Sequence, residues 1–180
     1  MKFKSIGLFV FLCLFITALS WAAPRSLYPL LAGKTVKVFV EETKDSTKER
    51  ETDPKALKTI LENQLRIRKS IHFEVVQDPE IADLRIETNL REFMWTAHGP
   101  VDMLMGVGTA VYDAVTVREY ARLTADMTVR DANSQKELWS YGMMARVKKS
   151  PMTRDESIPL VQEEFAKTFI KLCFSKRAGA

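Results

Sequence analysis

The sequence predicts an α+β fold: a two-layer sandwich in which a mixed sheet of about five strands carries two helices packed on one face. Three observations predict it. The chain opens with a strand, a helix and a strand, continues with three long alternating segments, and closes with a second amphipathic helix. The predicted order is β-α-β-β-β-β-α, with no internal repeat and no second domain.

The first strand and helix follow from local signals. Three valines alternate with other residues in Thr35–Val40, which predicts a strand with a buried face. The mixed charges of Glu41–Thr52 predict a mobile, solvated loop. Asp53 suits the cap of a helix, and Pro54 suits its first position. The apolar residues that follow recur at helical spacing: Leu57, Ile60, Leu61 and Leu65.

The remaining strands predict an antiparallel meander. Ile71–Val76 alternates and, with the first strand and helix, makes a βαβ unit with parallel strands. Long alternating stretches cover Ala82–Trp95, Arg118–Arg130 and Glu137–Lys149, and a short polar turn joins the last two as a hairpin. The alternation of the first stretch changes phase at Phe93 and Trp95, which predicts a bulge or an emergence from the sheet.

The last element is an amphipathic helix. Thr153 and Glu156 have the spacing of a capping box. The helix then carries apolar residues on one stripe: Ile158, Val161, Phe165, Phe169 and Leu172. Residues 34–175 are thus predicted to form a single α+β domain, between a lead-in segment, 23–33, and a disordered tail, 176–180.

The N-terminus has the pattern of a secretory signal peptide over residues 1–22. Two lysines precede an uncharged apolar stretch, and small residues at Ser20 and Ala22 favour cleavage between Ala22 and Ala23. The mature protein is therefore expected in the periplasm, with association with the outer membrane left open. The alternative is an uncleaved anchor, because the uncharged run 6–23 has 18 residues, the low end for a membrane span.

Composition limits the function classes. Removing the first 22 of 180 residues leaves 158, the size of one domain, with 25 Lys and Arg against 23 Asp and Glu. This near balance gives no support for binding to nucleic acid. Cys13 follows large residues, which argues against lipidation, and its removal leaves Cys173 as the only thiol. An intrachain disulfide and a cysteine-based zinc site are therefore excluded.

No motif nominates a catalytic, cofactor-binding or metal site. His72 and His98 lack the spacing of metal ligands, and Gly106-Val107-Gly108 lacks the third glycine and the lysine of nucleotide-binding motifs. No nucleophile elbow is present. We therefore predict a non-enzymatic domain with no cofactor, and an enzyme without a recognisable motif is the least favoured alternative.

The most unusual segment of the mature chain is the connection Trp95–Val117. It is apolar and about 20 residues long, whereas antiparallel strands are usually joined by roughly 2 to 5. Such a segment predicts a contact surface for a lipid, a membrane or a protein partner. The alternative is a flap or short helix buried on the uncovered sheet face. The candidate interaction residues are Trp95, Val101, Met103, Leu104, Met105, Val107 and Tyr112.

A family resemblance is carried by the element order and by three segments: the Val-rich strand entering a polar loop at Val36–Thr43, the strand entry Ala82–Ile86, and the hairpin around Val129–Asp131. The chain resembles small envelope proteins of Gram-negative bacteria, namely LptE-like lipopolysaccharide-assembly proteins and the TolB N-terminal and CsgG-like domains. The resemblance covers about Thr35 to Phe174. The lipidated cysteine of LptE is absent, so membrane anchoring is not carried over.

The resemblance implies a non-enzymatic periplasmic accessory protein of the cell envelope. Its partner would be an envelope component or assembly protein, bound at the sheet edge or through the Met-rich loop. The alternative is a lipid-binding or membrane-associated carrier that uses the same loop for peripheral contact with a membrane.

Overall fold

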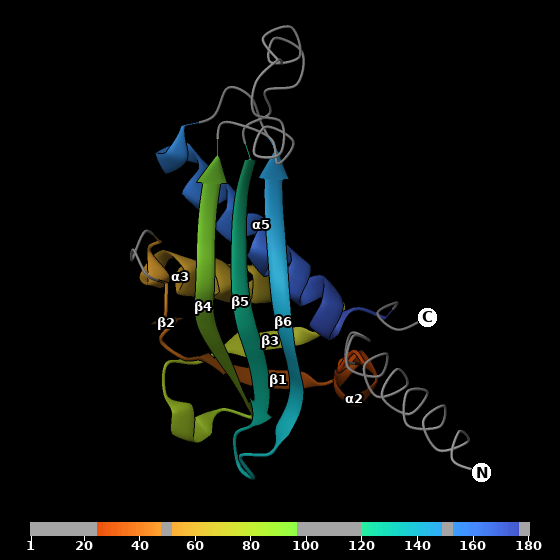
Figure 1. Cartoon of the computed structure of the whole chain (residues 1–180). Coiled ribbons are helices and arrows are strands. Elements are labelled where there is room, and N and C mark those ends of the chain that lie inside the picture. The colour runs from red at the N-terminus through yellow and green to blue at the C-terminus, as the bar shows by residue number, and fades with distance from the viewer. Residues whose placement is uncertain (1–24, 48–51, 97–119, 149–152, 177–180) are drawn as a thin grey trace, which may run out of the picture.

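A computed structural model describes residues 25–47, 52–96, 120–148 and 153–176. The described residues confirm the α+β class: a mixed, open sheet carries its two long helices on one face (Figure 1). The strands are β1 (Thr35–Val40), β2 (Lys44–Asp45), β3 (His72–Val75), β4 (Leu84–Thr96), β5 (Tyr120–Asp131) and β6 (Glu137–Lys148). The helices are α2 (Tyr28–Leu31), α3 (Pro54–Arg66) and α5 (Arg154–Phe174), with a 3₁₀ turn at Pro79–Ile81. The sheet order is β3-β1-β4-β5-β6, and β2 also pairs with β4.

The short strand β2 corrects the prediction of a solvated loop over Glu41–Thr52. Lys44 and Asp45 pair in parallel with Asn89 and Leu90 of β4, and the next residue, Ser46, donates its backbone N–H to the Leu90 carbonyl at 3.0 Å. The sheet therefore has six strands instead of five. A strand of two residues is too short to show an alternating pattern, and the charged residues around it are typical of a loop.

The predicted βαβ unit is confirmed. Strands β1 and β3 pair in parallel, and α3 connects them. Asp53 caps α3, since its Oδ1 accepts from the backbone N–H groups of Lys55 at 3.0 Å and Ala56 at 3.2 Å. The leucines predicted to face the core are fully buried, whereas Ile60 is only half-buried.

The meander and its bulge are also confirmed. Strands β4, β5 and β6 pair antiparallel, and the register of β4 against β5 shifts at Arg91, between Leu90 and Glu92. Arg91 is the extra residue of the bulge. Because of it, the side chains of Phe93 and Trp95 lie on the face that the helices cover.

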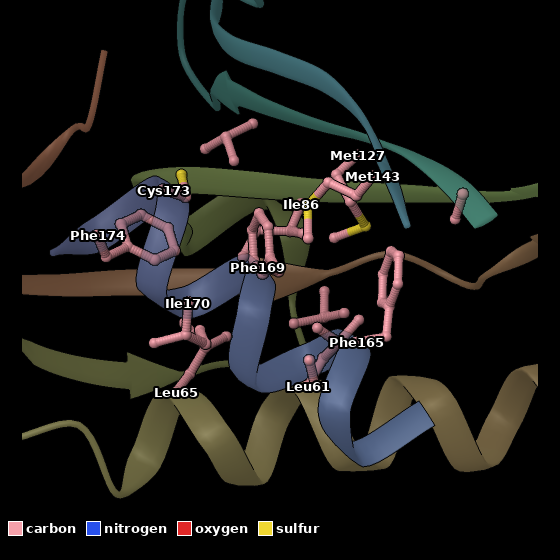
Figure 2. Close-up of a cluster of buried hydrophobic side chains, with 14 of the residues drawn as sticks. Leu61, Leu65, Ile86, Met127, Met143, Phe165, Phe169, Ile170, Cys173 and Phe174 are labelled. Atoms are coloured by element: carbon pink, nitrogen blue, oxygen red, sulfur yellow. The ribbon is translucent and has the colours of Figure 1, made fainter. Parts of the chain in front are cut away.

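Helix α5 lies against both the sheet and α3, as Figure 2 shows. Phe169 makes edge-to-face contacts with Trp139 of β6 at 5.6 Å and with Phe174 at 5.6 Å between ring centroids. The predicted capping box at Thr153 is present. The predicted stripe is too narrow, because a helix with neighbours on two sides buries a wider face. Ile158 and Leu172 are half-buried, while residues outside the stripe are buried: Ala166, Ile170, Cys173 and Phe174.

Candidate interaction surface

The predicted interaction loop lies largely outside the described residues. Of its seven candidate residues, Val101, Met103, Leu104, Met105, Val107 and Tyr112 fall in the range 97–119. Trp95 is described: it pairs with Ala121 of β5 and packs, half-buried, against the core. Its buried indole N–H has no hydrogen-bond partner among the described residues. The sheet thus fixes the position of Trp95 but provides no hydrogen-bond acceptor for its indole N–H.

The place where this connection joins the sheet is well defined. Thr96 of β4 pairs with Tyr120 of β5, so the segment 97–119 leaves and re-enters the domain at one end of the sheet. Helices α3 and α5 lie on one side of the sheet, and we call the opposite side the open face (Figure 1). The attachment points of the apolar segment, Thr96 and Tyr120, therefore lie at this end of the sheet.

Five side chains form what we call the loop-end surface, at this end of the open face: Glu92, Met94, Tyr120, Arg122 and Arg146. The guanidinium carbon of Arg146 lies 4.1 Å from the centroid of the Tyr120 ring. The Tyr120 hydroxyl donates to the sulfur of Met94 at 3.7 Å. Arg122 donates to both carboxylate oxygens of Glu92, at 2.9 and 3.0 Å. Aromatic, sulfur-containing and cationic groups thus pack side by side on an accessible sheet.

The charge of the open face is uneven from strand to strand. The acids that β4 and β5 place on the open face are each paired with a cross-strand arginine: Glu87 with Arg130, Glu92 with Arg122, and Asp126 with Arg91. Strand β6 adds Arg146 and Lys148, for which the described residues supply no acidic partner. The loop-end surface therefore carries excess positive charge beside Tyr120 and Met94. Tyr, Met and Arg are residues enriched in protein interfaces.

Sequence reasoning missed Tyr120, Arg122 and Arg146. Alternation placed them on the polar face of their strands, but a polar residue on a strand is ordinarily only solvated. Their grouping depends on the register of three strands, with Met94, Arg122 and Arg146 in one row across the sheet. No feature of the sequence alone sets that register relative to the end of the sheet.

A groove lies between the end of α3 and α5. This groove has a volume of about 320 Å³ and is lined by Gln64, Ile67, Arg68, Lys69, Lys167 and Ile170. Its cations already have partners in part: Lys167 lies 2.7 Å from Glu163, which raises the pKa of the lysine, and Arg68 donates to the Ser70 hydroxyl at 2.9 Å. The groove is therefore a weaker candidate than the loop-end surface.

The described residues contain no group of three or more His, Cys, Asp and Glu side chains placed to hold a metal ion. Within the same residues, no helix has both the length and the apolar character needed to cross a bilayer. The thiol of Cys173 is buried, and burial raises its pKa well above the ordinary value, so it is held as an unreactive core group.

Comparison with known proteins identifies the fold. No protein-family model and no curated protein sequence matches the chain. Among solved structures, the PelC dodecamer from Paraburkholderia phytofirmans is similar over 86% of this chain and 96% of that chain, with 12% identity and a TM-score of 0.53. A hypothetical protein from Chlamydia trachomatis is similar over 76% of this chain and 94% of that chain, with 7% identity and a TM-score of 0.53. These likenesses show a shared fold and do not single out LptE or TolB.

Proposed function

We propose that this chain is a non-enzymatic accessory protein of the bacterial cell envelope that binds an assembly partner through the loop-end surface and the adjoining segment 97–119. The observation that carries the proposal is the packing of Arg146 on Tyr120 beside Met94, at the point where an apolar, Met-rich segment joins the sheet. The N-terminal signal pattern supports export, and the shared fold with PelC, crystallised as a dodecamer, supports a role in assembly.

The surface suits a protein partner for physical reasons. Tyr and Met offer apolar area, and an arginine stacked on an aromatic ring keeps donors free for acidic or carbonyl groups of the partner. The sheet beneath holds these groups in register, so little conformational entropy is lost when a partner binds.

Native mass spectrometry of the protein isolated from the compartment to which it is exported tests the proposal. A second, defined chain is expected to co-purify in a fixed ratio. Replacing Met103, Leu104 and Met105 by Ser, or Arg146→Glu, is expected to abolish its capture while leaving the unfolding midpoint unchanged. Lys171→Glu, at an exposed position of α5, is the matched control and is expected to retain the partner. Capture that survives both surface variants would contradict the proposal.

One observation favours a second candidate, peripheral contact with a membrane. Lys148 lies opposite Tyr120, where the apolar segment joins β5, and Arg146 packs on the Tyr120 ring. Cations combined with apolar side chains favour an anionic bilayer surface. Sedimentation with vesicles of anionic phospholipid, compared with neutral vesicles, separates the two. Binding to anionic vesicles that is lost in Arg146→Glu, with no co-purifying chain, would favour the membrane role over the protein partner.

A further inference from the structure

Strand β6 is one of the two edge strands of the sheet, and it is long. It spans Glu137–Lys148, pairs with β5 along one side, and has no strand on its other side among the described residues. An unpaired edge of this length presents a row of free backbone donors and acceptors, which is a template for another strand.

The hydrogen bonds of β5 show which residues of β6 carry those free groups. Asp131 donates its backbone N–H toward β6, to Lys136, and the next residue, Ala132, donates toward β4, to Asp83. Successive residues of a strand point their backbone N–H and C=O groups to opposite sides, so the odd-numbered residues of β5 direct these groups toward β6. Their partners include Tyr141, Met143 and Ala145. The intervening residues of β6 therefore point their N–H and C=O groups outward: Ser140, Gly142, Met144, Arg146 and Lys148.

This edge lacks most of the features that usually block strand pairing. The outward-facing residues include no proline, the one irregularity lies near the start of the strand, at the register shift opposite Val129, and the terminal Lys148 is the only lysine among them. Met144 at its centre is 58% exposed, a large apolar side chain held in solvent.

We propose that β6 pairs antiparallel with β6 of a second copy of this chain, with Met144 facing Met144 of the second copy. The inference deepens the proposed assembly role by naming one partner, a second copy of the chain. Its significance for the envelope rests on the proposed function, whereas the pairing itself does not. Pairing by this register joins outward-facing residues throughout and forms about ten main-chain hydrogen bonds. The contact is self-complementary, as a twofold interface requires.

Charge and shape favour this register. It places Arg146 of one copy opposite Gly142 of the other. Gly142 lies across from Asp126 of β5, and a Cβ at position 142 would come within 3.4 Å of the Asp126 carboxylate. The absence of a side chain therefore leaves the Asp126 carboxylate, which is part of a half-exposed ion pair with Arg91, open to the second copy's arginine. The exposed Met144 side chains cover each other, and no like charges face directly across the new pair.

Disulfide trapping of the purified exported protein, from which removal of residues 1–22 takes Cys13, tests the register. Residues directly opposite in such a pair have Cα atoms about 5.5 Å apart, within the range of a disulfide. Met144→Cys is expected to form a covalent dimer under mild oxidation, whereas Ser140→Cys, which faces Lys148 of the second copy, is expected not to. The buried Cys173 is expected to give no cross-link in the parent protein.

Sedimentation velocity over a wide range of concentration tests the edge itself. The parent protein is expected to reach the mass of two chains, and Met144→Pro to remain at the mass of one. This proline removes an outward N–H and leaves the β5–β6 hydrogen bonds intact. Met144→Thr keeps the N–H and is the control for folding and for the side chain, and it is expected to dimerise more weakly.

A parent protein that stays monomeric at every concentration, or a Met144→Pro variant that still dimerises, would overturn the inference. Equal cross-linking at positions 140 and 144 would overturn the register. Each of these results is independent of whether a different chain co-purifies in native mass spectrometry, so failure here is distinguishable from failure of the proposed function.

Discussion

The backbone N–H of Leu27 donates to the carbonyl of Cys173 at 2.7 Å, which joins the start of the described chain to the last turn of α5. The Ser26 hydroxyl donates to the same carbonyl at 2.9 Å. The carbonyls of a helix's last turn lack partners within the helix, and these two donors satisfy one of them. The Leu27 side chain is 3% exposed and belongs to the core. Part of the predicted lead-in segment therefore helps to hold α5 in place.

Leu27→Ala is expected to lower the free energy of unfolding by about 2–4 kcal/mol, because it removes a buried side chain and leaves a cavity at the end of α5. Urea unfolding followed by circular dichroism measures the change. Leu30→Ala is the matched control, since Leu30 is 59% exposed, and a change within about 0.5 kcal/mol is expected there. A loss for Leu27→Ala as small as that expected for Leu30→Ala would show that Leu27 is not part of the core.

Much of the fold was predictable because it depends on sequence patterns that extend over only a few residues. Asp53 before Pro54, the Thr153 capping box and the phase change at Phe93 each act over a few residues, and each is confirmed. The role of Leu27 was not predictable, since it depends on contact with a helix at the other end of the chain. Leu27, Leu30 and Leu31 stand close together in a short segment with two prolines, and so short a pattern does not show which leucine is buried.

The candidate surface also combines features that are visible in the sequence with features that depend on contacts between distant residues. The apolar character of 97–119 is visible in the sequence, and the residues between which it attaches follow from the strand predictions. The proximity of Arg146 to Tyr120 depends on the pairing of β5 with β6, where Tyr120 lies opposite Lys148 and Arg122 opposite Arg146. Turn length and bulges together fix such a register, and a shift of one residue would move Arg146 to the covered face.

The hairpin turn contains a carboxylate whose titration should be shifted. Asp131 accepts hydrogen bonds from the backbone N–H of Ser134 at 2.7 Å, from its hydroxyl at 2.9 Å and from the backbone N–H of Asn133 at 3.1 Å. The Ser134 backbone bond, followed by the hydroxyl bond, lowers the pKa of Asp131 below the ordinary value of 3.8. The bonded, ionised form is favoured in the folded turn.

Because the folded pKa is lowered, the stabilisation from Asp131 is fully present above pH 3.8 and is lost as the pH falls through the folded value. Carboxyl ¹³C NMR titration is expected to give a midpoint below 3.8 for Asp131. Ser134→Ala removes the hydroxyl bond and keeps the backbone bond, so the midpoint is expected to rise only part of the way. A midpoint at or above 3.8 in the parent protein would contradict this account.

Helix α5 offers a direct test of which face is buried. The apolar stripe in the sequence predicts Leu172 in the core, whereas the structure buries Ile170, at 4% exposure, and leaves Leu172 half-buried. Ile170 faces Leu65 of α3 in Figure 2 because α5 packs against α3 as well as against the sheet. Ile170→Ala is therefore expected to cost about 2–4 kcal/mol in the free energy of unfolding, and Leu172→Ala clearly less.

Urea unfolding of the two variants side by side measures the difference, with unchanged denaturant slopes as the sign that the same cooperative unit unfolds. The comparison is well matched because both changes shorten a four-carbon side chain to a methyl group two residues apart on one helix. A larger loss for Leu172→Ala would place α5 in the orientation that the stripe predicts, and α3 would then lie against a different face of α5.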